Sequence, residues 1–177
     1  KVMVLQNWRQ DNAAYHVQPR MVVGNRLDYH FNDELVFDGG NEFRNFDLKS
    51  LKYQSELIAL IDYNDEGNQV YLHPDNRRTY KQYVRDDDLN GKFFLEKEDA
   101  RDSDTEGDYS YVHLTLPYDF PLVNGNLYIF GGLTDWQFRD EAKMEYDFEE
   151  HVYRGRLYLK QGYYNYAYVF LEDGFEA

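Results

Sequence analysis

Aromatic and aliphatic residues alternate with polar ones in short runs along most of the chain. The alternation is clear at residues 27–31, 43–48, 109–116 and 163–171. Because successive side chains of a strand point to opposite faces, this period of two predicts half-buried β-strands. No stretch of helical periodicity is sustained, and the best helical candidate, residues 47–59, is better interpreted as strand–turn–strand. With 18 Tyr and 12 Phe among 177 residues, types that suit a pleated surface, the sequence predicts an all-β protein.

A hairpin and a boundary are visible within this pattern. Residues 64–68 lie between two strand-like runs, and Gly67 is at the position that favours a left-handed backbone. Residues 96–108 are charged and lack apolar side chains other than alanine, as in a linker. We therefore predict two immunoglobulin-like β-sandwich domains, residues 1–98 and 105–177. The second shows five strands where such a domain needs about seven, so a closing strand is either missing from the chain or supplied by another segment.

Charge and cysteine content exclude several classes of function. The chain has 33 acidic and 19 basic side chains, a net charge of −14, which disfavours nucleic acids and anionic membrane surfaces as partners. It has no cysteine, so disulfides, thiol nucleophiles and thiolate metal sites are excluded. No apolar run approaches the roughly 18 residues of a membrane helix. Since Lys1 is not a start methionine, we interpret the chain as an internal fragment whose signal peptide lies outside it.

Motifs for metal binding and catalysis are incomplete. Residues 86–91 begin like a calcium loop, but Lys97 stands where a bidentate glutamate is needed; residues 102–107 fail in the same way at His113. The five histidines do not have a metal-binding spacing, and there is no nucleophile elbow or glycine-rich phosphate loop. No pair of carboxylates stands out for glycoside hydrolysis. The sequence therefore predicts a protein without metal, cofactor or enzymatic activity.

Two segments in the second half of the chain have the pattern of a strand followed by a turn. Residues 126–136 read as a strand that runs through Gly131 and Gly132 into a bend ending at Trp136, and residues 162–174 read as a late hairpin strand. Together they resemble the early-set immunoglobulin-like fold of the glycogen-binding module of the AMP-activated kinase β-subunit. The resemblance implies that Trp136 is the stacking residue of a carbohydrate site.

The other anchors implied by that resemblance are changed. The lysine of the late strand falls on Ala167, and the second tryptophan would follow Gly174, where Phe175 is found. A carbohydrate-binding module is therefore the alternative hypothesis. We expect Trp136 instead to close the bend by packing against the late strand.

The late strand has two faces that the same alignment distinguishes. Tyr166, Tyr168 and Phe170 are expected to point inward. Their neighbours Asn165, Ala167 and Val169 would then form a small, weakly polar patch on the outside. That patch is the candidate partner-binding site, for a neighbouring domain, the closing strand or another protein.

A longer resemblance covers nearly the whole chain. It rests on four blocks, residues 37–53, 88–93, 104–109 and 158–166. These resemble the middle and C-terminal part of the type IX secretion system plug protein family, long recorded as a domain of unknown function in Gram-negative bacteria. The resemblance implies a non-enzymatic, protein-binding role at the periplasmic face of the outer membrane, where the partner is the translocon barrel. The plug role belongs to some family members, so the resemblance leaves open whether this chain plugs the barrel or acts elsewhere in the pathway.

Overall fold

The protein is built almost entirely of strands. The computed structural model describes residues 2–6, 13–30, 35–37, 43–78 and 89–174. The helical elements with described bounds are α1 (Ser103–Glu106) and the 3-10 turns η2 (Gly132–Thr134) and η3 (Asp140–Ala142). The predicted all-β class is thus confirmed. Within the described ranges, no helix has the length and hydropathy of a membrane span.

The chain forms two compact units, Lys1–Asn41 and Glu42–Ala177. The described residues of the first unit form two separate antiparallel pairs, β1 (Val2–Val4) with β2 (Ala14–Val17) and β3 (Met21–Val23) with β4 (Arg26–Asp28). Val17 is the one buried residue among those described in this unit. Two ribbons with so little buried apolar surface are not a sandwich, so the prediction of a sandwich domain at the N-terminus is wrong.

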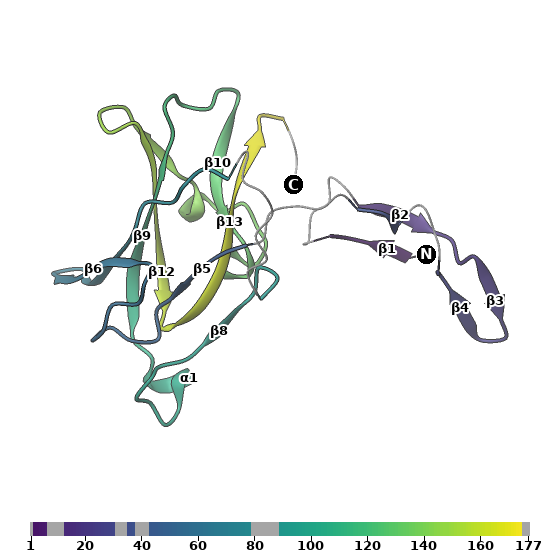
Figure 1. The fold of residues 1–177 in the computed structure, drawn as a ribbon, viewed down its shortest axis with the longest axis horizontal. Helices are drawn as coiled ribbons and strands as arrows, with labels where there is room; N and C mark the ends of the chain where they lie inside the picture. The colour runs from purple at the N-terminus through teal and green to yellow at the C-terminus, as the bar shows by residue number, and fades with distance from the viewer. Residues whose placement is uncertain (1, 7–12, 31–34, 38–42, 79–88, 175–177) are drawn as a thin grey trace. The chain divides into compact units, whose positions relative to one another are not determined.

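The second unit is a β-sandwich (Figure 1). One sheet has the order β10 (Gly125–Phe130), β13 (Gly162–Glu172), β5 (Arg44–Asp47), and β8 (Phe93–Leu95) also pairs with β13. The other has the order β11 (Glu145–Asp147), β12 (Val152–Lys160), β9 (Tyr109–Pro117), β7 (Gly67–Leu72), β6 (Ile58–Asn64). All pairs are antiparallel except β7 with β9.

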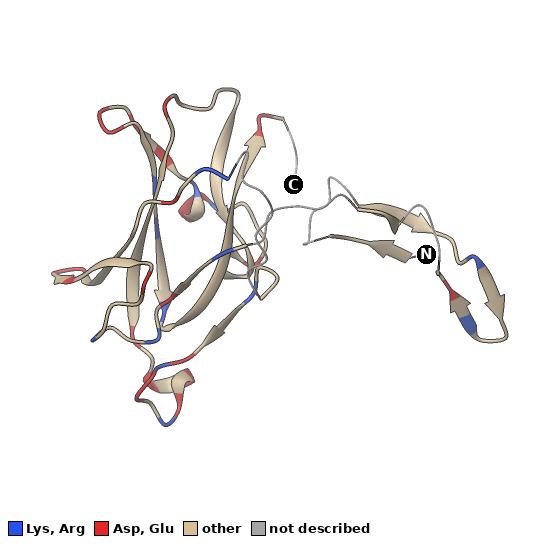
Figure 2. Cartoon of the chain, in the orientation of Figure 1, with Lys and Arg blue, Asp and Glu red and all other residues tan. Residues whose placement is uncertain are grey.

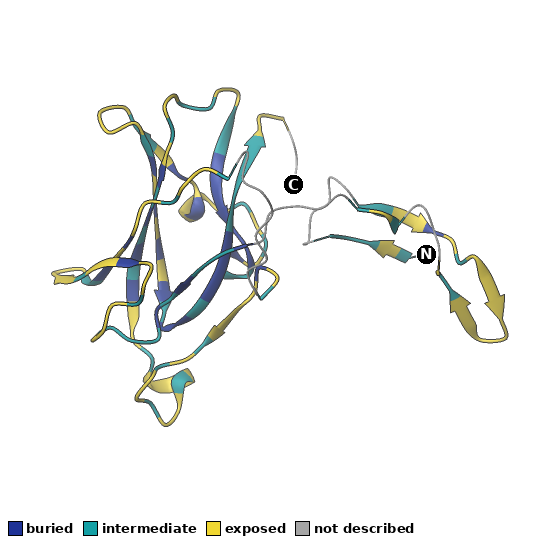
Figure 3. Cartoon of the chain, in the orientation of Figure 1, coloured by how far each residue is buried: buried dark blue, intermediate teal, exposed yellow. Residues whose placement is uncertain are grey.

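The core lies between the inner faces of these sheets (Figure 3). Strand β9 shows how the alternation builds it, since Val112 and Leu114 are buried while Tyr111 and His113 are only half-buried. From the opposite sheet, Phe46 and Ile129 are buried as completely. Burial of such side chains contributes about 1.5–3 kcal/mol each, so the inner faces of both sheets specify the fold.

The predicted division at residues 98–105 is also wrong. Strands from both sides of it share each sheet: β13 pairs with β5 and β8, and β9 pairs with β7. These segments supply the closing strands that the C-terminal part lacks. The charged stretch is the crossover that carries the chain from β8 in one sheet to β9 in the other. Its polar composition reflects exposure within one domain.

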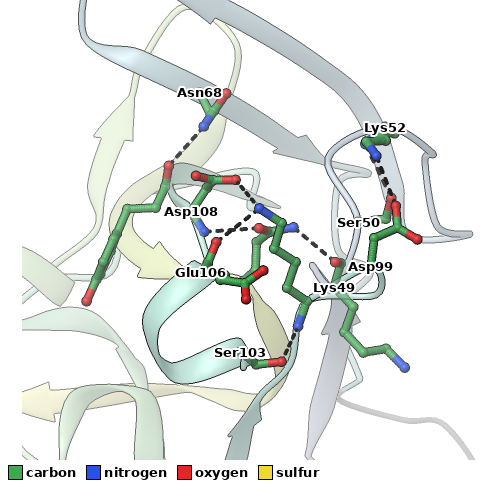
Figure 4. Close-up of polar contacts among 11 residues, drawn as sticks. Lys49, Ser50, Lys52, Asn68, Asp99, Ser103, Glu106 and Asp108 are labelled. Carbon is green, nitrogen blue, oxygen red and sulfur yellow. Dashed lines mark hydrogen bonds and ion pairs between the residues drawn. The ribbon is translucent and has the colours of Figure 1, made fainter. Parts of the chain in front are cut away.

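Polar contacts hold this crossover in place (Figure 4). The Lys97 ammonium lies 2.9 Å from the Asp108 carboxylate and donates to the Glu106 carbonyl oxygen at 3.0 Å, while the Lys97 amide donates to the Ser103 hydroxyl at 3.0 Å. The Asp102 side chain accepts from the amide of Asp104 and caps α1. The stretch is therefore fixed by specific bonds at several points.

Gln161 is the corner at which β12 passes from one sheet into β13 of the other. Its side-chain amide donates to the Lys49 carbonyl at 2.9 Å, and its side-chain oxygen accepts from the Asp108 amide at 3.0 Å. Its backbone donates to the Asp108 carbonyl at 2.9 Å and accepts from the Glu96 amide at 3.2 Å. Only 3% of Gln161 is exposed, and this one residue bonds to the segments that follow β5 and β8 and to the segment that precedes β9.

Several local predictions are confirmed. The hairpin of β6 and β7 turns through residues 64–67, and Gly67 has a φ of +110°. Strands occur as expected in β5, β8, β9, β10, β12 and β13. Strands β2, β3 and β11 are three or four residues long and were not expected, because runs so short leave little periodicity.

We expect Gln161→Ala to lower the free energy of unfolding by about 1–3 kcal/mol, because it leaves the Asp108 amide without its side-chain acceptor and removes one of the two donors to the Lys49 carbonyl. The matched control is Gln137→Ala, at an exposed position, which should change that free energy by less than about 0.5 kcal/mol. Urea unfolding followed by circular dichroism measures both. Equal midpoints for the two variants would contradict the role of Gln161 as the corner.

Candidate functional site

Trp136 stands at the bend that follows β10. Its amide donates to the Gly131 carbonyl at 3.0 Å. Its ring makes edge contacts with Phe43 and Phe130, with ring centroids 6.0 and 5.7 Å apart. The ring therefore closes the bend by packing on these two phenylalanines, whereas the expected packing was against the late strand.

The backbone at this bend is strained. Asp135 and Trp136 have φ angles of +53° and +59°, in the left-handed region that non-glycine residues rarely adopt. Such a conformation costs about 1–3 kcal/mol per residue and persists only where the surroundings hold it. Here the Asp135 carboxylate pairs with Arg139, and the half-buried ring of Trp136 is packed on its neighbours.

A shallow hollow of about 320 Å³ opens beside the Trp136 ring. It is lined by Trp136, Phe93, Lys92, Asp135 and Gly132. It thus combines two aromatic rings with one amine and one carboxylate, a composition that suits a small polar ligand with an apolar face. Lys92 reaches this hollow from the segment before β8, which the sequence did not associate with Trp136.

The outer face of β13 differs from its prediction at one residue. Tyr166, Tyr168 and Phe170 point toward the core, as expected. Asn165, however, is 0% exposed, because the segment at residues 89–92 covers it. The backbone amide of Leu89 donates to the Asn165 side-chain oxygen, and the backbone amide of Asn165 donates to the Lys92 carbonyl at 3.0 Å. Asn165 therefore has no surface to offer a partner. Ala167 and Val169 are half-buried, and their role stays a prediction.

On the inner side of the same strand, the Asp75 carboxylate accepts hydrogen bonds from three side chains. The hydroxyls of Tyr166 and Tyr168 each donate to the Asp75 carboxylate at 2.6 Å, and the Arg44 guanidinium donates to it at 2.7 Å. The Asp75 amide donates to the Thr115 carbonyl at 2.8 Å. This cluster fastens the connection after β7 to both sheets, and burial raises the pKa of both tyrosines.

An exposed aromatic ladder covers the outer face of the five-stranded sheet. We give this name to Tyr71 of β7, Tyr109, Tyr111 and His113 of β9, and Tyr158 of β12. Tyr71 stacks on His113 at 4.2 Å between ring centroids, and Tyr158 lies 5.1 Å from Tyr109 and 4.7 Å from Tyr111. Tyr158 is 58% exposed and Tyr109 48%. The rings form a preordered surface across three neighbouring strands.

Cations cover further ring faces of the ladder. The Arg156 guanidinium lies 4.4 Å above the Tyr111 ring, and the Lys160 amine lies 5.6 Å from the centre of Tyr109. Arg156 also pairs with Glu66 at 2.8 Å. Burial, followed by the charge of Arg156, lowers the pKa of His113, whose Nε2 is 2.9 Å from the Gln69 side-chain oxygen. His113 is therefore neutral at physiological pH.

The sequence could have shown part of the ladder. The alternation of residues 109–116 places Tyr109, Tyr111 and His113 on one face and Val112 with Leu114 on the other. Nothing in the sequence indicates that β7 and β12 lie on either side of β9, because that register depends on long-range pairing.

The edge strand β6 is protected against strand addition. Its ladder contains an irregularity between Ile58 and Leu60. The Ala59 carbonyl accepts from the Gln54 side chain at 3.2 Å, and the Tyr63 amide donates to the Asp62 carboxylate at 2.8 Å. These bonds occupy edge groups that a foreign strand would need.

Metal-binding candidates are not supported by geometry. Among the residues that the structure describes, no three His, Asp or Glu side chains gather as a metal site requires. Of the two calcium-like stretches, residues 86–88 lie outside the described residues, as does Phe175. In the other, Asp102 caps α1 and its carboxylate also accepts from the Thr105 hydroxyl at 3.0 Å.

Comparison with known proteins supports the fold. The chain is similar to a hypothetical protein from Parabacteroides merdae ATCC 43184, solved by crystallography at 2.30 Å, with a TM-score of 0.85 and 38% sequence identity. The similarity covers 97% of this chain and 43% of that one, so the chain spans less than half the length of its structural neighbour. No protein-family model matches the sequence, and neither does any curated protein.

Gly91→Ala tests the packing beneath Trp136. A Cβ at Gly91 would lie 2.5 Å from Trp136 Cη2 and 2.6 Å from Phe43, on a backbone with a φ of +75°. We expect the free energy of unfolding to fall by about 2–5 kcal/mol. At Gly67, where φ is +110° and nothing lies within 4 Å, alanine should cost about 1–2 kcal/mol. Urea unfolding of the two variants measures these losses, with the fluorescence of Trp136 as the signal in a Trp8→Phe background. Equal losses of unfolding free energy would show that the Trp136 ring does not rest on Gly91.

The buried tyrosines predict alkaline instability. The pKa values of Tyr164 and Tyr166 are raised, chiefly by burial, so the folded protein keeps these protons while the unfolded chain ionises near pH 10. The stability they contribute is complete below about pH 10 and is lost as the pH rises further, by about 1.4 kcal/mol per pH unit for each tyrosine. Denaturation between pH 8 and pH 11 should show this fall, and Tyr164→Phe should make it shallower. A flat profile above pH 10 would contradict it.

Proposed function

We propose that this chain is a non-enzymatic protein-binding module of type IX secretion, acting at the periplasmic face of the outer membrane, where it plugs or binds the translocon barrel. The aromatic ladder is the observation that carries the protein-binding part of the proposal. The four sequence blocks described above are the basis for the secretion pathway, the location and the identity of the partner.

The ladder favours protein over carbohydrate as its ligand. Sugars bind by lying on a free aromatic face beside a few polar groups. In the ladder, Tyr109, Tyr111 and Tyr158 already stack on one another, and cations lie over two of these rings. What remains for a ligand is ring edges and hydroxyls, which suit the mixed polar and apolar surface of a protein.

The ladder is also suited to docking by its order and charge. Side chains already held by their neighbours lose little freedom when a partner binds, and this lowers the cost of association. Arg154 pairs with Asp147 at 3.1 Å and Arg156 pairs with Glu66 at 2.8 Å. The positive charges of this face are therefore neutralised by neighbouring carboxylates, although the chain as a whole has a net charge of −14. An acidic partner would meet less repulsion here than on a purely acidic surface.

Carbohydrate binding at Trp136 is the second candidate function. The hollow beside Trp136 and Phe93, with Lys92 and Asp135 at its sides, is the observation that favours it. Titration with glycogen should quench the fluorescence of Trp136 if this function is real. Loss of the quenching in Lys92→Ala, with unfolding unchanged, would assign the hollow to the ligand.

The docking proposal predicts that Tyr109→Ala combined with Tyr158→Ala weakens binding to the purified translocon barrel by about 30-fold, because aromatic anchors at the centre of an interface contribute most of its affinity. Tyr53→Ala, at a residue that is 72% exposed and outside the ladder, is the matched control and should bind like the unchanged chain. Biolayer interferometry in detergent measures all three. Failure of the unchanged chain to bind the barrel would remove the proposal.

A further inference from the structure

Two phenylalanines stand exposed on the loops at one end of the sandwich. Phe120, in the connection from β9 to β10, is 77% exposed, and Phe148, in the turn from β11 to β12, is 72% exposed. Both loops lie at the upper end of the sandwich in Figure 1. A phenylalanine in water forgoes the stabilisation that burial would supply, so two of them on neighbouring loops form an apolar surface that a partner could cover.

The loop that carries Phe120 is held rigidly from below. The Tyr118 amide donates to the His151 carbonyl at 3.0 Å, and the Tyr146 hydroxyl donates to the Tyr118 carbonyl at 2.8 Å. The Leu122 amide donates to the Tyr153 hydroxyl at 2.7 Å. The residues on both sides of Phe120 are therefore fixed, while its own ring is left in solvent.

The turn that carries Phe148 is fixed in a similar way. The Asp147 carboxylate accepts from the amides of Glu149 and Glu150 at 2.9 and 3.1 Å. These amides, together with Arg154, lower the pKa of Asp147, so the carboxylate remains charged and keeps these bonds at neutral pH. The Phe148 ring meets Tyr146 edge-on, with centroids 5.0 Å apart. Tyr146 thus supports both loops.

Carboxylates surround the two rings. We call this surface the tip, which comprises Phe120 and Phe148 together with Asp119, Asp147, Glu149 and Glu150. Residues 117–124 and 147–153 contain no Lys or Arg, and Figure 2 shows the β11–β12 turn in red. Two arginines reach the tip from neighbouring segments, Arg77 at 3.5 Å from Asp119 and Arg154 at 3.1 Å from Asp147. Glu149 and Glu150 are exposed, so the tip keeps a negative charge.

We propose that the tip is a docking site for a protein partner whose apolar pocket receives Phe120 and Phe148 and whose rim carries lysine and arginine. Rigid aromatic side chains are the usual anchors of an interface, and the fixed loops lower the entropic cost of using them. The carboxylates admit a basic rim and repel an acidic one, so they select the partner and speed its approach. The same charges oppose insertion of the rings into an anionic bilayer.

The inference rests on the proposed protein-binding function and is tested on the same barrel. Phe120→Ser combined with Phe148→Ser should weaken binding about 30-fold, mainly through faster dissociation, without moving the urea midpoint. Glu149→Gln combined with Glu150→Gln should slow association and flatten its dependence on salt while leaving dissociation unchanged. A role in folding alone would not produce this division between the two rates.

Each outcome separates the inference from the function on which it rests. If the ladder variant loses binding and both tip variants bind like the unchanged chain, the tip is not a docking site and the proposed function stands. If the unchanged chain does not bind the barrel, both fail. If it binds vesicles of phosphatidylcholine, with or without an equal part of phosphatidylglycerol, and the phenylalanine variant does not, the tip is a membrane anchor and the inference is overturned.

Discussion

Both sheets of the sandwich meet at Gln161, and the chain can pass from β12 into β13 there because every polar group of that residue has a partner. A strand that changes sheets must turn inside the protein, where water cannot satisfy the backbone. Gln161 replaces that water with bonds to Lys49, Glu96 and Asp108. Those three residues begin or end segments in both sheets, so the relative placement of the sheets depends on the corner. The Asp75 cluster gives a second tie between the sheets, from the connection after β7.

The sequence predicted the individual strands better than it predicted how those strands pair into sheets. Period-two alternation located β5, β9, β12 and β13, since a half-buried strand has that pattern wherever it lies. The charged stretch before β9 has the composition of a linker, because exposure gives a linker and a crossover the same polar residues. Only long-range pairing tells them apart: β7 lies beside β9 and β5 beside β13. Such pairing leaves no local signal.

Prediction of the candidate sites from the sequence was limited in the same way, because the contacts of single residues also depend on segments that are distant in the chain. Alternation correctly placed Tyr166 and Asn165 on opposite faces of β13, but it could not show that residues 89–92 cover the outer face and bury Asn165. Trp136 was located at its bend from the two glycines before it. Its packing on Phe43 and Phe130 requires the closed sandwich, because Phe43 arrives from a segment far away in the chain.

Tyrosine has two structural roles in this protein, one in the exposed ladder and one in the interior. In the ladder, the rings present edges and hydroxyls to solvent. Beneath the tip, Tyr146 and Tyr153 use their hydroxyls as donor and acceptor to fasten neighbouring loops. Tyrosine suits both uses, since it combines a large apolar ring with one polar group at its end.

The hydroxyl clamps under the tip do in this chain what cross-links do in many small exported domains. The chain has no cysteine, so its loops are fastened without any oxidation step. Closing a disulfide requires an oxidant and, after a wrong pairing, an isomerase, whereas a hydroxyl finds its partner as the loop folds. The loops of this protein can therefore reach their final form at the same rate under reducing and oxidising conditions, and thiol reagents have no means of releasing them.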